Sequence, residues 1–485
     1  MPARGTGSLR HRRSRIGRSD RGPTSDRRTV ALVTLGCPKN QVDSEVMLGQ
    51  LAEAGLRVVS DERRADVVIV NTCGFIDAAR EESINTIIEL GELKKSGRCR
   101  TLIATGCLTQ RYQGELIREL PELDAIVGTG DFPQIAEIVR SRLGTAKAAA
   151  RSWFEHPTFL YDATTLRRRL GPRHWAYVKI SEGCDKRCAF CAIPSFRGDL
   201  ASRTIGSVVA EAQHLAAEGV REINLIAQDL PAFGMDHGRK GDLIALVREL
   251  GKIDDLQWIR LMYLYPHKLP AGLVDLFVEE PKLVPYVEMP VQHIDDRILR
   301  SMNRGGGSAE IRRTLDVFRD RVPNVAIRTS FIVGFPGETE REFDRLAAFV
   351  EEQRFDRIAV FTYSKEEGTA AAKLGDPVSA EIKAERRQRL LDLQLGISQA
   401  RGDATVGLRR TAMIEGPAQD DQFALEARLA TQAPEIDGVV YLEEMAGEPG
   451  DFVEVEITEA LGYDLVARPI VPSRHLPVIG ARGSS

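Results

Sequence analysis

The sequence predicts an α/β multidomain protein: an open parallel sheet first, a partial (β/α)6 barrel in the middle and a small antiparallel β-barrel at the end. Three observations lead to this prediction. The chain has 485 residues, which is too long for a single hydrophobic core. From residue 29, short apolar runs alternate with amphipathic helical segments, which is typical of parallel sheets. Near residue 405 the pattern changes to short β-branched runs between Gly and Pro turns, which favours antiparallel strands.

The first α/β domain is expected over residues 29–145, with three strands that are each followed by a helix. Each strand ends at a cysteine: Cys37 in LGCPKN, Cys73 in NTCGF and Cys107 in TGCLTQ. We call these the strand-end trio. Ligands of parallel sheets bind outside the carboxyl ends of the strands, which is where these thiols are expected. The strands are predicted at residues 29–36, 66–72 and 100–106, and the helices from about residues 41, 77 and 109.

The strand-end trio has a second interpretation. A free cysteine packs like a small hydrophobe, so each of these thiols taken alone is equally well explained as a buried core residue. The equivalent positions of all three favour a shared cluster. Cys99, in SGRCR, precedes a strand instead of following one and is expected to take no part.

The middle domain is expected over residues 171–402, after a linker at residues 146–170 where the βα alternation is lost. About six βα units suit an incomplete barrel better than the full eight. The third domain, the small barrel, is expected over residues 405–472. Strands of the middle domain are predicted at residues 174–180, 221–227, 257–264, 286–291, 325–334 and 356–364, and those of the barrel at residues 409–416, 423–430, 438–444 and 451–461.

Composition and charge exclude several classes of protein. No apolar run approaches the roughly 18–20 residues that a membrane span needs, and the N-terminus lacks the apolar segment of a secretory signal. Residues 1–28 hold nine arginines and two aspartates, so they are expected to form a disordered basic tail, with RNA contact as the alternative. A second tail is expected at residues 473–485. Seven cysteines in a chain without a secretory signal are expected to be thiols in the cytoplasm.

A second group of thiols lies on one loop, SEGCDKRCAFCAIPSFRG, at residues 181–198. Cys184, Cys188 and Cys191, which we call the loop trio, are spaced by four and then three residues. Structural zinc usually has two C-x2-C pairs, which make four ligands, and no histidine stands nearby at zinc spacing. Three thiolates on a four-iron cube leave one iron open, so the spacing favours an iron–sulfur cluster over zinc.

The spacing of the loop trio, Phe190 before its last cysteine and the βα context resemble the radical S-adenosylmethionine superfamily. The resemblance implies that the loop trio holds a 4Fe–4S cluster and that the open iron binds the amine and carboxylate of S-adenosylmethionine. One electron then breaks the sulfonium bond and releases a 5′-deoxyadenosyl radical. Phe190 is implied to contact the cofactor.

The three domains together resemble the radical S-adenosylmethionine methylthiotransferase family over residues 29 to about 470. The resemblance implies a transferase with a C-terminal TRAM barrel. It implies that the strand-end trio holds an auxiliary 4Fe–4S cluster that takes part in sulfur insertion. The implied reaction replaces C–H with C–S–CH3 and uses two S-adenosylmethionine molecules, one as radical source and one as methyl donor. An electron donor and a sulfur donor are implied as partners.

Other polar residues of the middle domain are weaker candidates. IRTSFIVGFPGET, at residues 327–339, ends a strand in a Gly-Pro-Gly turn. The resemblance implies that this segment, with Arg328 and Gly334, lies beside the adenosine of the cofactor; the alternative is simply a tight turn. Gln228 and Asp229 end another strand, where they are candidates for contact with cofactor or substrate, against the alternative of an exposed loop.

Two substrates are compatible with the family: an adenosine in transfer RNA, or the β-carbon of an aspartate in small-subunit ribosomal protein twelve. Residues 411–470 hold fourteen Asp and Glu but two Arg, a formal charge of −12, which disfavours RNA and favours a basic protein partner. The alternative is that this charge serves solubility. SEGCDKRCAFCAIPSFRG, RLMYLYPHK and PVQHIDDRILRSMNRGG also resemble the ribosomal-protein branch. We therefore expect modification of the ribosomal protein, free or in the ribosomal subunit. A non-catalytic iron–sulfur protein that binds RNA is the alternative from another class.

Overall fold

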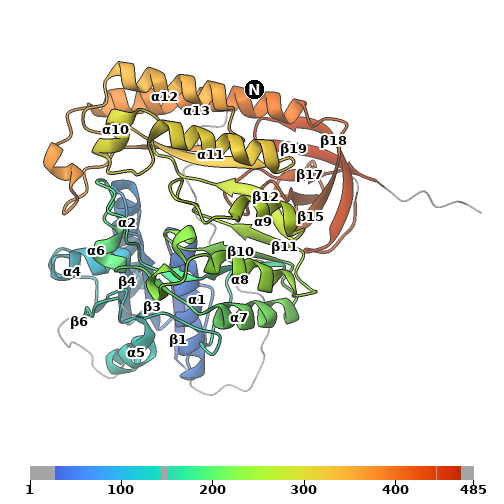
Figure 1. Ribbon diagram of the computed structural model, residues 1–485. Coiled ribbons are helices and arrows are strands. Elements are labelled where there is room, and N and C mark those ends of the chain that lie inside the picture. The colour runs from blue at the N-terminus through green and yellow to red at the C-terminus, as the bar shows by residue number, and fades with distance from the viewer. Residues whose placement is uncertain (1–27, 144–150, 158, 444, 471–485) are drawn as a thin grey trace, which may run out of the picture. The chain divides into compact units, whose positions relative to one another are not determined.

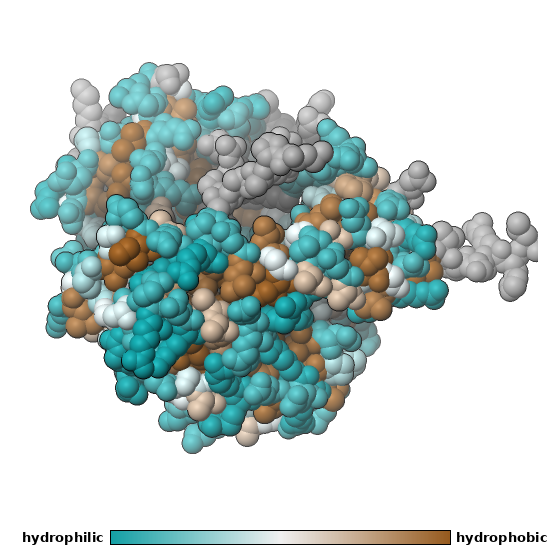
Figure 2. Space-filling model, turned by 90° about the horizontal axis from the view of Figure 1, so that it is seen from above, coloured by the Kyte–Doolittle hydropathy of each residue, from teal (hydrophilic) through white to brown (hydrophobic). Residues whose placement is uncertain are grey.

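The computed structural model describes residues 28–143, 151–157, 159–443 and 445–470 (Figure 1). The chain divides into two compact units between Gln394 and Leu395. Of the predicted basic tail, only Arg28 is described, and the tail predicted at residues 473–485 lies outside the described residues. No described helix combines the length and the apolar character that a membrane crossing requires. Hydrophilic residues predominate on the molecular face shown in Figure 2.

The first sheet of unit one has six parallel strands in the order β2-β1-β3-β4-β5-β6. Its central strands are buried along their whole length, which explains their continuous apolar runs. The sequence analysis did not identify β2, β5 and β6, which have two or three residues each, and β6 lies within the predicted linker. The strands are β1 Thr29–Thr34, β2 Arg57–Val58, β3 Val67–Thr72, β4 Thr101–Gly106, β5 Ala125–Val127 and β6 Arg151–Trp153. The helices are α1 Pro38–Glu53, α2 Asp77–Gly91, α3 Leu93–Ser96, α4 Cys107–Glu119 and α5 Ile135–Leu143.

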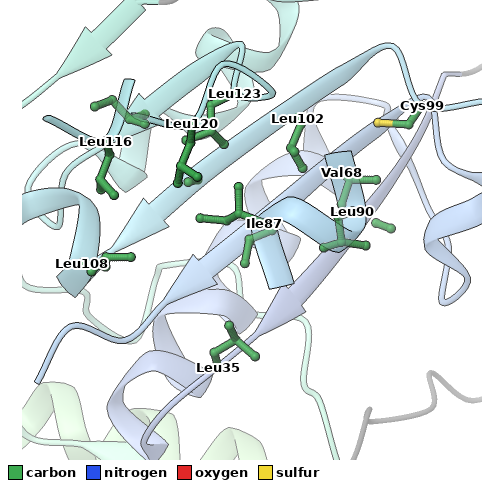
Figure 3. Packing of buried hydrophobic residues seen from close by; sticks show 14 of the residues in the cluster. Leu35, Val68, Ile87, Leu90, Cys99, Leu102, Leu108, Leu116, Leu120 and Leu123 are labelled. Carbon is green, nitrogen blue, oxygen red and sulfur yellow. The ribbon is translucent and has the colours of Figure 1, made fainter. Parts of the chain in front are cut away.

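One face of this sheet is covered by an apolar core to which α2 contributes. Ile87 and Leu90 of α2 belong to the same buried cluster as Val68 of β3 and Leu102 of β4 (Figure 3). Cys99 is part of this cluster, with 4% of its surface exposed. Figure 3 places it at the other end of β4 from Leu108, the residue after Cys107. Cys99 therefore packs as a hydrophobe, away from the edge where the strand-end trio lies.

The second sheet of unit one also has six parallel strands, in the order β14-β13-β12-β11-β10-β7. This arrangement confirms the predicted middle fold of six parallel strands. The strands are β7 Trp175–Lys179, β10 Glu222–Ile226, β11 Trp258–Leu261, β12 Leu283–Glu288, β13 Ala326–Val333 and β14 Arg357–Thr362. The helices are α6 Ile193–Arg197, α7 Ile205–Ala217, α8 Asp242–Gly251, α9 Leu273–Glu279, α10 Asp296–Ser301, α11 Gly307–Arg321, α12 Glu340–Gln353 and α13 Ala380–Asp403, and a short antiparallel pair joins β8 Ser181–Glu182 to β9 Ala201–Ser202.

Unit two is a closed five-stranded barrel in the order β15-β16-β17-β19-β18, which confirms the predicted barrel. The expectation of purely antiparallel pairing needs one correction, because β17 and β19 are parallel. The reason is parity: strands in a closed ring of five cannot all run opposite to both neighbours. The strands are β15 Arg409–Pro417, β16 Leu425–Leu429, β17 Val440–Leu442, β18 Phe452–Leu461 and β19 Asp464–Pro469.

Candidate active site

Unit one contains a cavity of about 420 Å³, and all six cysteines of the two trios line it. The strand-end trio comes from the first sheet and the loop trio from the loop after β7 and β8. The sequence placed each trio at a strand end but did not indicate that the two trios face a common space. The thiols that line this cavity are Cys37, Cys73, Cys107, Cys184, Cys188 and Cys191.

Close contact between loops brings the strand-end trio together. Cys37 is the residue before α1, and Pro38 at the first helical position starts that helix. Gly36 has φ +89°, and a Cβ there would lie 2.7 Å from Cys73 Cβ and 3.0 Å from its Sγ. Gly36 therefore allows the first two cysteine loops to touch. Cys107 begins α4 directly after Gly106, which has φ +101°.

Burial disfavours ionisation of these thiols. It raises the pKa of Cys73, and the neighbouring Cys107 and Cys37 raise it further. Burial also raises the pKa of Cys107 to about 11, although the positive Arg197 opposes this. Thiols bind metal as thiolates, so a bound metal has to displace their protons.

A buried ionic network holds Arg197 against Cys107. The Arg197 Nε lies 3.2 Å from Cys107 Sγ, and its Nη1 donates to Asp43 Oδ2 at 2.7 Å and to Glu182 Oε2 at 3.2 Å. Lys179 bonds to the same two carboxylates. All these side chains are buried. Since Asp43 is on α1 and Arg197 ends α6, the network fixes the two trios relative to each other within unit one.

Two backbone hydrogen bonds hold the loop that carries the loop trio. Cys184 N donates to Gly198 O at 3.1 Å, and Cys191 N donates to Cys188 O at 3.1 Å. Burial raises the pKa of Cys184 to about 11 and that of Cys191 to about 12. Arg304 Nη1 lies 3.5 Å from Cys188 Sγ, so a positive charge stands beside this trio as well.

Four of the other predicted residues line the cavity: Phe190, Gln228, Asp229 and Arg328. Gln228 donates to the buried Glu182, and Asp229 is paired with Lys186 at 3.5 Å. Neither residue is on an exposed loop.

Gly334 does not belong to the lining of this cavity. Its φ is +74°, and a Cβ there would lie 2.3 Å from Lys383 Cγ. Its N–H donates to Glu338 Oε1 at 2.8 Å. The turn of Gly334 therefore packs against Lys383, and its predicted place beside the adenosine of the cofactor stays a prediction.

The sequence analysis did not identify several residues of the lining. Lys39 follows Cys37 in LGCPKN, and its Nζ lies 3.0 Å from the centroid of the Tyr263 ring. Tyr263 has φ +66°, a conformation that is uncommon for a residue with a side chain. Arg304 stacks over Tyr265 at 4.2 Å. The only local signal was proximity to a cysteine for Lys39 and an aromatic run, YLY, for the two tyrosines.

The donor atoms of the two trios fit iron–sulfur clusters. No group of three or more His, Cys, Asp or Glu among the described residues is placed to hold a single metal ion. A four-iron cube differs from one ion because each thiolate binds a different iron, so its three ligands stand further apart. In both trios all protein donors are thiols, which is the ligand type such clusters prefer.

Three family models match the chain. They are the uncharacterized protein family UPF0004 at residues 29–128, the radical SAM superfamily at residues 178–350 and the TRAM domain at residues 406–470. The ranges cover the first sheet without β6, most of the second sheet and the barrel.

Close relatives match nearly the whole chain. The ribosomal protein uS12 methylthiotransferase RimO of Anaeromyxobacter sp. (strain K) is 50% identical, covering 92% of this chain and 94% of its own length. The chain belongs to the ribosomal protein uS12 methylthiotransferase family. Further members are the RimO proteins of Geobacter sulfurreducens, 47% identical over 91% of this chain and 98% of that one, and of Myxococcus xanthus, 46% identical over 92% and 93%. Membership confirms the predicted radical SAM methylthiotransferase.

A solved structure supports the fold of this uS12 methylthiotransferase family member. The radical S-adenosylmethionine methyltransferase TsrM from Kitasatospora setae, with tryptophan and a SAM analog bound, aligns with a TM-score of 0.51. The alignment covers 81% of this chain and 79% of that one at 16% identity. At this identity the likeness concerns the fold alone.

Proposed function

We propose that this chain methylthiolates ribosomal protein uS12, converting a C–H bond at the β-carbon of an aspartate to C–S–CH3. The observation that carries the proposal is the common cavity of the two cysteine trios, in a chain whose uS12-modifying relative matches 92% of its length. The reaction uses two S-adenosylmethionine molecules and takes place in the cytoplasm. It needs two further partners, a one-electron donor and a sulfur donor.

Each trio is proposed to hold one 4Fe–4S cluster. Cys184, Cys188 and Cys191 would hold three irons of one cluster and leave the fourth to S-adenosylmethionine. The strand-end trio would hold three irons of the auxiliary cluster. When bound, the first cluster and S-adenosylmethionine would supply the 5′-deoxyadenosyl radical, and the auxiliary cluster would take part in inserting the sulfur that the donor provides. The chain supplies thiolate ligands, position and exclusion of water.

Side chains around the trios are proposed to orient the cofactor and protect the reaction. Phe190, Gln228, Asp229 and Arg328 line the cavity and are candidate contacts of S-adenosylmethionine. Two large apolar side chains of the lining, Phe75 and Phe361, are 37% and 42% exposed. They are suited to cover a substrate segment that enters, which keeps a reactive radical away from water.

The loop trio depends on a glycine, and this gives a prediction. Gly183 has φ +72°, and a Cβ there would lie 2.0 Å from the backbone oxygen of Asp199. Because that contact is with backbone, we expect Gly183→Ala to displace Cys184 and to lower iron from about eight toward about four per chain. Iron analysis after anaerobic reconstitution measures this iron content.

Gly206→Ala, in α7 with nothing within 4 Å of the new Cβ, is the matched control and should keep full iron. Equal iron in both variants would contradict the prediction.

The charge of the barrel supports a basic protein substrate. Residues 411–470 carry a formal charge of −12. Seven of the described carboxylates in this range are exposed, and they contribute to an acidic surface that attracts a basic partner and repels phosphates. The exposed carboxylates are Asp421, Glu435, Glu443, Glu448, Asp451, Glu454 and Glu459.

The substrate is tested by comparing products in a deletion strain. Mass spectrometry of uS12 and of bulk transfer RNA is expected to show uS12 without its methylthio group and transfer RNA unchanged. Loss of a methylthio group from transfer RNA, with uS12 still modified, would establish the RNA-modifying function instead. Failure of the reduced, reconstituted protein to form 5′-deoxyadenosine would support a non-catalytic iron–sulfur protein.

A further inference from the structure

Five cationic side chains line the cavity, and four of them are already engaged by protein groups. Lys186 pairs with Asp229 at 3.5 Å, and Arg197 belongs to the buried network. Arg328 lies 3.8 Å from Glu288, and Arg304 donates to a backbone carbonyl. The fifth is Lys39. Within the described parts of the chain, its ammonium group makes no hydrogen bond and no ion pair within 4 Å, and it lies over the face of Tyr263.

Lys39 is held in an unusual position for a lysine without a carboxylate partner. Only 7% of the surface of Lys39 is exposed, and the residue lines the cavity. A buried charge without a paired anion is costly, and such charges are normally paired or bound to a ligand. The ring of Tyr263 offsets part of this cost. An anion bound inside the cavity would stabilise the ammonium group further.

The position of Lys39 on its helix specifies where that anion would lie. Lys39 is in the first turn of α1, two residues after Cys37. The first turn of α1 contains no acidic residue, and the positive end of the helix dipole adds to the positive potential there. An anion bound there is adjacent to the strand-end trio, where the proposed function places sulfur transfer.

We propose that Lys39 binds the side-chain carboxylate of the substrate aspartate and thereby selects aspartate and positions its β-carbon beside the strand-end trio. The inference rests on the proposed function, because it takes uS12 as substrate. The β-carbon of aspartate is bonded directly to its carboxylate carbon. A contact between the ammonium group and the carboxylate therefore limits where the β-carbon can lie. The ring of Tyr263 keeps the ammonium group of Lys39 in position.

The test is a double-mutant cycle on binding, with protein reconstituted anaerobically and S-adenosylmethionine present. Wild-type protein and Lys39→Met are each titrated with uS12 and with uS12 in which asparagine replaces the modified aspartate. A charged hydrogen bond predicts that the wild type prefers the aspartate form by about 10- to 100-fold. Lys39→Met is expected to bind both forms with equal affinity. Lys39→Arg, which retains the charge, is expected to recover part of the preference.

The matched control is Lys186→Met, which removes the other lysine of the cavity but one already paired with Asp229. It should keep the preference for aspartate. An undiminished preference in Lys39→Met would overturn the proposal. So would weaker binding of S-adenosylmethionine with the preference retained, because Lys39 would then serve the cofactor. Wild-type protein that modifies uS12 but shows no preference for aspartate refutes the role of Lys39 alone; wild-type protein that does not modify uS12 refutes the proposed function.

Discussion

Replacing Cys184, Cys188 and Cys191 together with alanine is expected to abolish the formation of 5′-deoxyadenosine and to lower iron from about eight to about four per chain. The reason is that these are the only thiols of the loop, and no histidine lines the cavity to replace them. The expected loss of cofactor cleavage is complete, because the open iron on which the cofactor depends is no longer held. Product analysis by liquid chromatography, together with iron and sulfide determination, measures both quantities.

Cys99→Ala is the matched control for this variant. Cys99 is buried in the core of the first sheet, and its Sγ lies 3.4 Å from the Thr101 carbonyl oxygen. Its removal should leave iron content and cofactor cleavage at wild-type values. Cofactor cleavage by the triple variant at the wild-type rate would show that the loop trio is not the radical site.

Replacing Cys37, Cys73 and Cys107 with alanine is expected to stop methylthiolation but not cofactor cleavage. Iron again falls to about four per chain, but reduced protein still forms 5′-deoxyadenosine, while methylthiolated uS12 falls below detection. The physical reason is that the loop trio is held by its own backbone contacts, such as Cys184 N to Gly198 O. Mass spectrometry of uS12, run beside nucleoside analysis of the same reaction, distinguishes the two steps. Methylthiolation that persists at the wild-type level would exclude a sulfur-transfer role for the strand-end trio.

The loop trio and the fold were predictable because their signals are local or topological. Three cysteines in eight residues of sequence specify one loop. The strand-end trio follows from the rule that the carboxyl ends of parallel strands share an edge. Helix starts were less accurate: α1 begins at Pro38, before the predicted residue 41, because Cys37 takes the capping position and Pro suits the first turn. Strands β2, β5 and β6 are too short to give a periodic pattern.

Other parts of the site could not be read from the sequence, because they depend on contacts between distant segments. Lys39 contacts Tyr263, more than two hundred residues along the chain, and Arg197 reaches Cys107 from helix α6. The turn of Gly334 depends on a similar contact, because Lys383 packs against it. The common cavity of the two trios also depends on contacts between distant segments, and neither cysteine motif indicates where the other lies.

Isotope transfer from the substrate tests the central claim most directly. The claim is that the loop trio supports a radical that removes hydrogen from the aspartate β-carbon within the shared cavity. With uS12 deuterated at that carbon, mass spectrometry is expected to find deuterium in the 5′-deoxyadenosine formed alongside methylthiolated product. Methylthiolated uS12 accompanied by 5′-deoxyadenosine without deuterium would contradict the claim.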